Sequence, residues 1–383
     1  MLKQLINLGP ISSGRQRINK NVLIFGGFGF IGSNLALEYV NRGAKVTVLD
    51  NLETTAGGNL FNLHPCINDI EYINSSIVQY DEVLKAVKDK QIIFNSASIS
   101  SHSLSMKEPR KNIEVNMIGV LNILEALKTC RSEASFVHIG TTTQYGTLIY
   151  EPADENHPEF PTDIYSANKV VGEKYVLLYS RAYDLNTCVV RLPNTFGPRA
   201  AIHSPLYTFN NYFIGLALQG KDITVFKPGE QLRNVLYIED AVAALMLAAE
   251  SIQLSKAETF LAVGDHHYSV RELATKTCSS MGGKVNLIDW PEDLKNIEIG
   301  NAKYSNKKIK SVLGWTPKIK LEDKPPTKVK NKNSLPTFNE VVDGMEKIEG
   351  LLTFYRNIDK NKLFLALSEE EIEQIYFFNM TRN

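Results

Sequence analysis

Residues 21–33 of the chain read NVLIFGGFGFIGS. The apolar run Val22–Phe25 is typical of a buried strand, and a helical pattern follows the glycines. The glycines between them, Gly26, Gly29 and Gly32, are spaced as GxxGxxG. This spacing permits a tight turn, a close approach of the backbone to a pyrophosphate, and close packing of the helix on the strand. Because the helix N-terminus offers free N–H groups to phosphates, the segment predicts a dinucleotide-binding turn.

A second signal lies at the end of the next strand pattern, KVTVLD. Asp50 closes this pattern and follows Gly32 by eighteen residues. A carboxylate at this position accepts hydrogen bonds from the adenosine ribose hydroxyls and repels a 2′-phosphate, which favours NAD over NADP. The alternative is that Asp50 caps a turn.

Short apolar runs alternate with longer helical stretches outward from this turn, as far as about residue 192. Strands are expected at 22–25, 45–49, 71–74, 92–97, 136–140 and 187–192. Helices are expected at about 31–42, 81–89, 111–130 and 164–182. The alternation predicts an α/β fold with a Rossmann-type, doubly wound parallel sheet, in which ligands bind at the carboxyl ends of the strands.

The pattern becomes irregular after residue 192, which predicts a smaller α/β cap that binds the substrate. The expected organisation is an N-terminal extension (1–20), an NAD-binding Rossmann domain (21–192) to which some later elements can return, a substrate-binding region (193–321), a linker or insert (322–342), and a closing helix with a C-terminal tail (343–383). The closing helix is expected over about 338–356.

A candidate catalytic pair lies in YSANK, at the start of the helix expected at 164–182. Tyr165 and Lys169 are four residues apart and therefore share one face of that helix. A nearby ammonium group favours the phenolate, as does the positive charge of an oxidised nicotinamide. The phenolate can then accept a proton from a sugar hydroxyl while hydride leaves the same carbon. Such pairs are also common on solvated helices, and the position after the fifth strand is what favours catalysis here.

The segment TTTQYG, residues 141–146, ends the fifth strand. A threonine hydroxyl at this place could hydrogen-bond the reacting sugar oxygen. The threonines could equally be strand and turn residues.

Taken together, these motifs resemble the NAD-dependent nucleotide-sugar epimerase/dehydratase family of extended short-chain dehydrogenases/reductases, whose best-known branch is UDP-glucose 4-epimerase. The resemblance covers about residues 21–320. It rests on GGFGFIG, LDNL, the run Asn116–Ala126, TTTQYG, YSANK, RLPNTFGPR and QLRNVLYIED.

The resemblance implies NAD as cofactor, a nucleotide-diphosphate sugar as substrate, and Thr141, Tyr165 and Lys169 as the catalytic residues. The implied NAD-binding positions are Gly26, Gly29, Phe30, Ile31, Gly32, Asp50, Asn51, Ile77, Ala97, Asn116, Tyr165, Lys169 and Pro193. Ser76 is also a cofactor candidate, at a position where the family often has an acidic residue that meets the adenine. The implied substrate-binding residues are Thr141, Asn194 and Arg233, and the planar guanidinium of an arginine suits a diphosphate.

The chain departs from the family pattern at Thr142 and Thr143, in an insert and in its tail. Thr142 and Thr143 stand where the 4,6-dehydratase branch has an Asp-Glu pair that eliminates water across C5 and C6. Because two hydroxyl groups cannot supply that acid/base pair, a standard dehydratase is not expected. The 322–342 insert interrupts the family pattern, and the tail beyond about 357 has no counterpart in it.

The expected reaction is inversion of C4 of a nucleoside-diphosphate hexose through a transient 4-keto intermediate. The alternatives keep the cofactor and change the outcome: a 2-epimerase, a 4-ketoreductase, an atypical dehydratase or a sulfosugar synthase. A different class is a non-catalytic NAD-binding scaffold, which the intact Thr141, Tyr165 and Lys169 set argues against. Fold alone does not choose among them.

Composition and charge indicate a cytoplasmic globular protein. Lys plus Arg and Asp plus Glu both number 42, so no net field favours nucleic acid or an anionic membrane as partner. No apolar segment approaches the roughly 18 residues of a membrane span, and the four cysteines show no CxxC pair. His266 and His267 have no cysteine or acidic cluster nearby, so no metal site is expected.

The resemblance also implies a homodimer. In the family, the helices corresponding to 111–130 and 164–182 pair with their symmetry mates as a four-helix bundle. Ile113, Met117, Val120 and Leu124 give the first of these helices an apolar stripe, although part of that stripe must cover the sheet.

Overall fold

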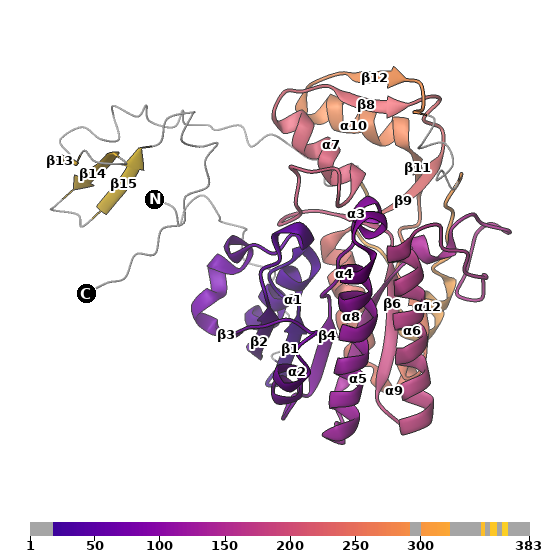
Figure 1. The fold of residues 1–383 in the computed structure, drawn as a ribbon. Helices are drawn as coiled ribbons and strands as arrows, with labels where there is room; N and C mark the ends of the chain where they lie inside the picture. Colours follow the sequence, from indigo (N-terminus) through magenta and orange to yellow (C-terminus); the bar gives the residue numbers. More distant parts are fainter. Residues whose placement is uncertain (1–17, 292–299, 322–345, 349–352, 358–361, 367–383) are drawn as a thin grey trace. The chain divides into compact units, whose positions relative to one another are not determined.

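The computed structural model describes residues 18–291, 300–321, 346–348, 353–357 and 362–366. The chain forms two compact units, Met1–Lys328 and Val329–Asn383. The first unit holds the large sheet with its helices and a smaller cap, and the second holds a small antiparallel sheet (Figure 1).

The large sheet has seven strands, and every neighbouring pair in it is parallel. Its strand order is β10 (Thr259–Leu261), β6 (Thr187–Leu192), β5 (Ser135–Thr141), β4 (Ile92–Asn95), β1 (Asn21–Phe25), β2 (Lys45–Asp50) and β3 (Ile70–Asn74). The predicted Rossmann-type sheet is therefore confirmed. One of its edge strands, β10, comes from the region beyond residue 192.

Successive side chains of β1 point to opposite faces of the sheet, as in any strand. Val22 and Ile24 belong to one apolar core, Leu23 and Phe25 belong to the other, and all four are fully buried. The first core lies under α1 (Phe30–Asn41) and α8 (Ile238–Glu250). The second lies under α2 (Tyr80–Ala86), α5 (Gly119–Thr129) and α6 (Ile164–Tyr183). Helices α5 and α6 run side by side over this face (Figure 1).

The helix expected at 111–130 contains a change of helix type. It consists of α4 (Pro109–Ile113), a π-helical turn (Glu114–Ile118) and α5. Asn116 lies in the π-helical turn, and its side-chain amide donates to the carbonyl of Ile99 and to Asn112. Such π-turns occur frequently at functional sites.

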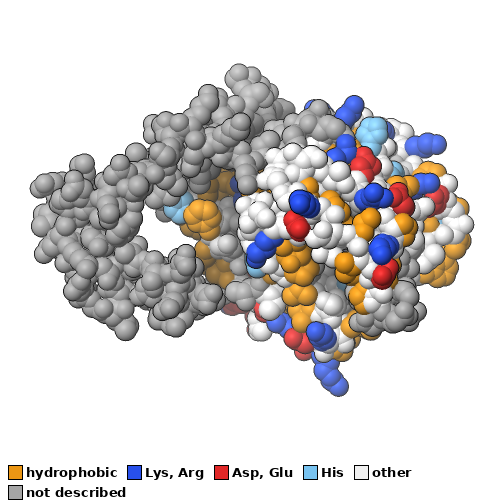
Figure 2. All heavy atoms as spheres, turned by 90° about the horizontal axis from the view of Figure 1, so that it is seen from above, with side chains coloured by type: hydrophobic (Ala, Val, Ile, Leu, Met, Phe, Trp, Pro, Cys, Tyr) orange, Lys and Arg blue, Asp and Glu red, His pale blue; other side chains and the backbone are white. Residues whose placement is uncertain are grey.

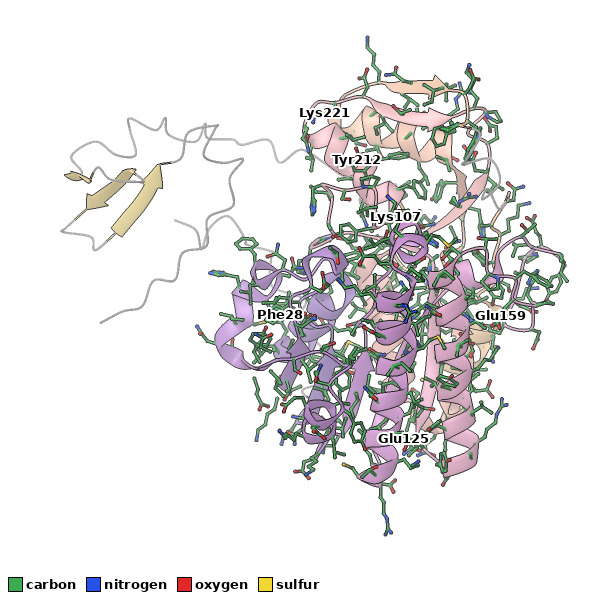
Figure 3. The ribbon with its side chains drawn as sticks, in the orientation of Figure 1. Phe28, Lys107, Glu125, Glu159, Tyr212 and Lys221 are labelled. Carbon is green, nitrogen blue, oxygen red and sulfur yellow. The ribbon has the colours of Figure 1, made fainter. Side chains whose placement is uncertain are left out.

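The cap is built from the segments after residue 192. Its three-stranded sheet has the order β11 (His267–Ser269), β9 (Leu232–Tyr237) and β7 (Asn194–Phe196), and β8 (Ile223–Phe226) pairs with β12 (Val285–Ile288). A separate apolar core joins α7 (Phe209–Leu218) and α10 (Val270–Met281) to β8. Figure 3 shows Tyr212 and Lys221 in this cap and Glu125 at the opposite end of α5. The shorter helices are α3 (His102–Lys107), α9 (Ile252–Ser255) and α12 (Lys307–Leu313).

The second unit contains strands where a helix was expected over about 338–356. Strand β14 (Thr353–Asn357) pairs antiparallel with β13 (Glu346–Ile348) and with β15 (Lys362–Ala366). The helix prediction is wrong for these residues. The sequence TFYRN is rich in β-branched and aromatic side chains, which favour strands, and Gly350 disfavours a helix. The expected insert at 322–342 lies outside the described residues.

The surface of the first unit carries no field of a single charge on the face seen in Figure 2, where basic and acidic side chains are interspersed. This agrees with the equal numbers of acidic and basic residues. Within the described ranges, no helix combines the length and the apolar character needed to span a membrane.

Candidate active site

The glycine turn between β1 and α1 leaves no room for a side chain at two positions. Gly26 has φ +73°, and a Cβ there would lie 2.6 Å from the Cα of Ala97. A Cβ on Gly32 would lie 2.2 Å from the carbonyl oxygen of Gly26. The N-cap residue of α1 is Gly29, which has no side chain to offer the first N–H groups of the helix. These N–H groups and the positive end of the helix dipole therefore form a cradle suited to a phosphate.

We expect Gly32→Ala to yield protein that purifies without NAD, whereas the wild type should purify with NAD(H) bound. The added methyl group must displace the Gly26 carbonyl and distort the phosphate cradle. Acid release of the cofactor followed by chromatography would measure the occupancy.

Gly43→Ala is the matched control for this change. Gly43 also has positive φ, at +81°, but a Cβ there meets nothing within 4 Å. Its substitution costs backbone strain without touching the cradle. Equal cofactor loss in both variants would contradict the assignment.

Asp50 lies at the carboxyl end of β2 with little exposure. Its Oδ2 accepts from the Phe28 amide at 2.9 Å, and its Oδ1 accepts from the Leu52 amide at 2.7 Å. Burial raises the pKa of this carboxyl group, and the two backbone hydrogen bonds oppose the shift. Asp50 thus braces the glycine turn, as the turn-capping alternative supposed. Each carboxylate oxygen still has lone-pair capacity to accept a ribose hydroxyl.

Two cavities lie along the carboxyl edge of the sheet, and both include Gly26 and Gly29. The first, the reaction cavity, contains predicted site residues from both the sheet and the cap: Phe30, Ile31, Gly32, Thr141, Tyr165, Lys169, Pro193 and Asn194. The second, the adenosine cavity, contains Asp50, Asn51, Ser76, Ile77 and Ala97. The shared glycines lie where a pyrophosphate would join the halves of a dinucleotide. The residues present therefore fit NAD.

Two predicted site residues line neither cavity. Asn116 is buried, and its amide groups bond Ser98, Ile99 and Asn112. Arg233 lies on β9, where its guanidinium donates to the carbonyl oxygens of Leu232 and Gly300. Strand β9 pairs with β7 through Val235 and Asn194, so Arg233 lies two residues along the strand from the partner of a cavity residue. A diphosphate-binding role for Arg233 stays a prediction.

Tyr165 is in the first turn of α6 and almost fully buried. Burial raises the pKa of Tyr165 to about 12, and hydrogen bonds from Thr141 and Ser98 oppose that shift. Thr141 from the end of β5 and Ser98 from the segment after β4 line the same cavity as the phenol. In the protein alone it is a neutral acid at physiological pH.

Lys169 lies one turn further along α6 and is 3% exposed. Its Nζ donates to the Ile139 carbonyl at 2.6 Å and lies 3.1 Å from His138 Nε2. Burial lowers the pKa of Lys169 to about 8. Burial, followed by the nearby Lys169 ammonium, also holds the pKa of His138 well below its usual value. Sequence reasoning missed His138, although it lies three residues before Thr141 on the same strand.

The threonine segment after β5 forms a 3₁₀ turn, Thr142–Tyr145, closed by a capping box. Thr141 Oγ1 accepts from the Thr143 amide, and Gln144 Oε1 accepts from the Thr141 amide, both at 3.3 Å. This turn fixes Thr141 in the lining of the cavity that also contains Tyr165. The turn interpretation of the threonines is thereby confirmed, and a catalytic role for Thr141 stays a prediction.

A buried ion pair between Arg191 and Glu173 contacts this turn through Gln144. Arg191 on β6 donates to Glu173 on α6 through Nε at 2.8 Å and through Nη2 at 2.6 Å, and it also bonds Glu159. Gln144 donates to the same Glu173 carboxylate at 3.0 Å. Sequence reasoning missed this pair, although Glu173 follows Lys169 by four residues and so lies on the same helix face. Glu159 lies in the segment beside α6 (Figure 3).

The comparison with known families agrees with this geometry. A profile of the NAD dependent epimerase/dehydratase family matches residues 22–264. The chain belongs to this family. The predicted family and the predicted cofactor, NAD, are thereby confirmed.

Known members of the epimerase/dehydratase family that resemble this chain differ in their reactions. The chain is 29% identical over 305 residues to a putative UDP-glucose 4-epimerase of Methanocaldococcus jannaschii. The aligned region covers 79% of this chain and 95% of that protein. It is 29% identical over 322 residues to UDP-glucuronic acid decarboxylase 1 of Xenopus tropicalis, and this aligned region covers 82% of this chain and 72% of that protein. The solved UDP-glucose 4-epimerase of Thermotoga maritima with UDP-glucose has a TM-score of 0.71 and 26% identity, and it covers 79% and 95%.

Proposed function

We propose that this member of the epimerase/dehydratase family is an NAD-dependent epimerase that inverts C4 of a nucleoside-diphosphate hexose. The observation that carries the proposal is the chemistry of the reaction cavity. Among the described residues that line it, the only Lys or Arg is Lys169 and there is no Asp or Glu. Hydroxyl and amide side chains surround Tyr165 instead. Such a lining suits an uncharged sugar and lacks the carboxylates that dehydration requires.

In the proposed mechanism Tyr165 acts as the phenolate, which the Lys169 ammonium and the positive charge of an oxidised nicotinamide would favour, and takes the proton of the sugar hydroxyl. Thr141 would hold the reacting oxygen by a hydrogen bond. Lys169 would hold the nicotinamide ribose, while Asp50 and the glycine turn would hold the adenosine and pyrophosphate. Bound NAD supplies reversible hydride transfer. The 4-keto sugar turns within the cavity, and Tyr165 returns the proton when hydride comes back to the opposite face.

The test is incubation of the purified holoenzyme with UDP-, GDP-, CDP- and dTDP-hexoses, analysed by NMR and mass spectrometry. We expect interconversion of the C4 epimers of one sugar with no change of mass, and we expect UDP-sugars to react because the epimerase relatives are named for them. The panel includes UDP-glucuronic acid, since other relatives are decarboxylases. Loss of carbon dioxide or of water, with no epimer formed, would overturn the proposal.

We also propose a homodimer formed through α5, α6 and the π-helical turn. Only part of the predicted apolar stripe is available for pairing. Val120 and Leu124 are buried in the sheet core, whereas Ile113 is 38% exposed. Ile118 and Leu178, at 42% and 56% exposed, add apolar surface on the same pair of elements. The face available for pairing is therefore the outer surface of these helices.

Leu178→Glu is expected to shift the protein from dimer to monomer, because it places a charge on the apolar surface of the proposed interface. Light scattering at micromolar concentration would measure the change. Leu254→Glu is the matched control, since Leu254 on α9 is also 56% exposed and lies outside the proposed interface. A wild-type monomer, or equal behaviour of the two variants, would contradict the dimer.

A further inference from the structure

His102 is a polar side chain of the reaction cavity that has no role in the proposed mechanism. It is the first residue of α3, the short helix that ends at Lys107 (Figure 3). Its side chain is 46% exposed, so a ligand in the cavity can reach it. The imidazole ring lies edge-on to the ring of Tyr165, with centroids 5.2 Å apart. An imidazole therefore stands beside the phenol that is proposed to act on the sugar.

Two separate contacts fix His102 relative to Tyr165. The buried Ser105 Oγ donates to the His102 carbonyl at 2.7 Å and accepts from the Tyr165 amide at 3.1 Å. The His102 Nδ1 lies 2.7 Å from Oδ2 of Asp163, which is the N-cap residue of α6. Both contacts reach the start of α6, one through the backbone of His102 and one through its side chain. The imidazole is thus held in one place before any ligand binds.

The contact with Asp163 determines which nitrogen of His102 is available to a ligand. Although burial alone would raise the pKa of Asp163, hydrogen bonds from His102 and Ser166 hold it below its usual value. An ionised carboxylate can only accept, so His102 Nδ1 carries a proton and donates the hydrogen bond. The other nitrogen, Nε2, makes no hydrogen bond with any residue that the structure describes. Nε2 is therefore the polar atom that His102 can offer to a ligand.

Neighbouring polar side chains of the same cavity differ from His102 in this respect. Ser98 Oγ donates to Asn116 Oδ1 at 2.8 Å, and Ser96 Oγ donates to the Phe25 carbonyl at 2.6 Å. A hydroxyl group has a single proton to donate, so these two serines have already used theirs within the protein. Nε2 of His102 has no such commitment and can pair with a ligand at no loss of an internal hydrogen bond.

We propose that Nε2 of His102 hydrogen-bonds a second hydroxyl group of the sugar, beside the hydroxyl that Tyr165 deprotonates. The inference rests on the proposed function, because it needs a hexose to lie against Tyr165. A hydroxyl group suits Nε2 in either protonation state, since it can donate to the neutral ring and accept from the protonated one. His102 is then a substrate-binding residue that selects a hexose in which this second hydroxyl is present.

The test compares kcat/KM of the holoenzyme for UDP-glucose and UDP-galactose with kcat/KM for their 2-, 3- and 6-deoxy forms. Both epimers are needed, because the sugar turns within the cavity during the proposed reaction. In the wild type we expect removal of one particular hydroxyl, in at least one epimer, to lower kcat/KM about two- to tenfold, as the loss of a hydrogen bond does. That sugar position identifies the partner of His102.

His102→Asn and His102→Gln separate the sugar contact from the contact with Asp163. The shorter asparagine amide takes the place of Nδ1, so it can still donate to Asp163 but leaves nothing at the place of Nε2. The longer glutamine amide reaches the place of Nε2 and leaves Asp163 without this partner. We expect His102→Asn to lose the discrimination against the sensitive deoxy sugar and His102→Gln to retain it. Release of bound NAD checks that each variant is folded.

The possible results distinguish the inference from the proposed function. The same sensitivity to every deoxy form in the wild type and in His102→Asn would overturn the sugar contact and leave the epimerase intact. Discrimination that is lost in His102→Gln and kept in His102→Asn would overturn it too, because His102 would then act only through Asp163. A wild-type holoenzyme that epimerises neither UDP-glucose nor UDP-galactose would overturn the UDP-hexose function, and the sugar contact with it.

Discussion

Tyr165→Phe is expected to lower the rate of sugar oxidation by about a hundred- to ten-thousand-fold, the usual cost of losing a positioned proton-transfer group. The change removes one oxygen atom and keeps the ring, which packs beside His102. The sugar hydroxyl then has no acceptor for its proton. Single-turnover formation of NADH in the holoenzyme measures the effect.

The controls for Tyr165→Phe separate chemistry from folding and binding. Cofactor occupancy and the free energy of unfolding should remain close to wild type. Thr141→Val should slow the reaction less, because it removes a hydrogen bond to the phenol and keeps the phenol itself. Lys169→Met should slow the reaction and also weaken NAD binding. Near-native turnover by Tyr165→Phe would show that the catalytic assignment is wrong.

Arg191→Met is expected to lower the free energy of unfolding by about 3–5 kcal/mol, since it leaves a buried carboxylate without its cation. The side chains of Arg191 and Glu173 are 2% and 1% exposed. Glu173 also accepts from Gln144 and from Thr259 on β10, so the carboxylate joins α6, the threonine turn and the sheet edge. Urea unfolding at neutral pH would measure the loss.

The destabilisation by Arg191→Met should shrink as the pH falls. In the wild type, burial alone would raise the pKa of Glu173, but Arg191 and Gln144 hold it below the ordinary value of 4.5. That pair therefore stabilises the fold above about this pH and loses its effect as the pH drops through the folded-state pKa. In the variant, Arg191 no longer opposes the effect of burial, so the pKa of Glu173 rises. Acidification then protonates Glu173, which removes the buried charge and reduces the loss in free energy of unfolding.

Two further variants complete this experiment. Arg191→Met combined with Glu173→Leu should recover part of the stability, because no uncompensated charge remains buried. Lys85→Met removes an ion pair with Glu82 on the exposed surface and should leave unfolding unchanged. An Arg191→Met protein as stable as the Lys85→Met protein would contradict the importance assigned to the buried pair.

The local sequence pattern was sufficient to predict the parallel sheet and the glycine turn, because both depend on residues that are neighbours in the sequence. Continuous apolar runs identify strands covered on both faces, and the clash that a Cβ on Gly32 would meet explains why glycine is required there. The helix spacing of Tyr165 and Lys169 was readable for the same reason. In the second unit, local pattern failed, because apolar spacing alone did not distinguish a short helix from the paired strands β13 and β14.

The sequence by itself determined the family, the Rossmann-type sheet and the cofactor, and it predicted Thr141, Tyr165 and Lys169 as the catalytic residues. Only the tertiary structure decided what surrounds that set, because contacts between residues distant in the chain depend on packing. His102 and Asp163 are 61 residues apart in sequence, yet their side chains meet at 2.7 Å. Burial, which no motif encodes, raises the pKa of Tyr165 and lowers that of Lys169. The electrostatic surroundings of the predicted catalytic residues therefore came from the fold.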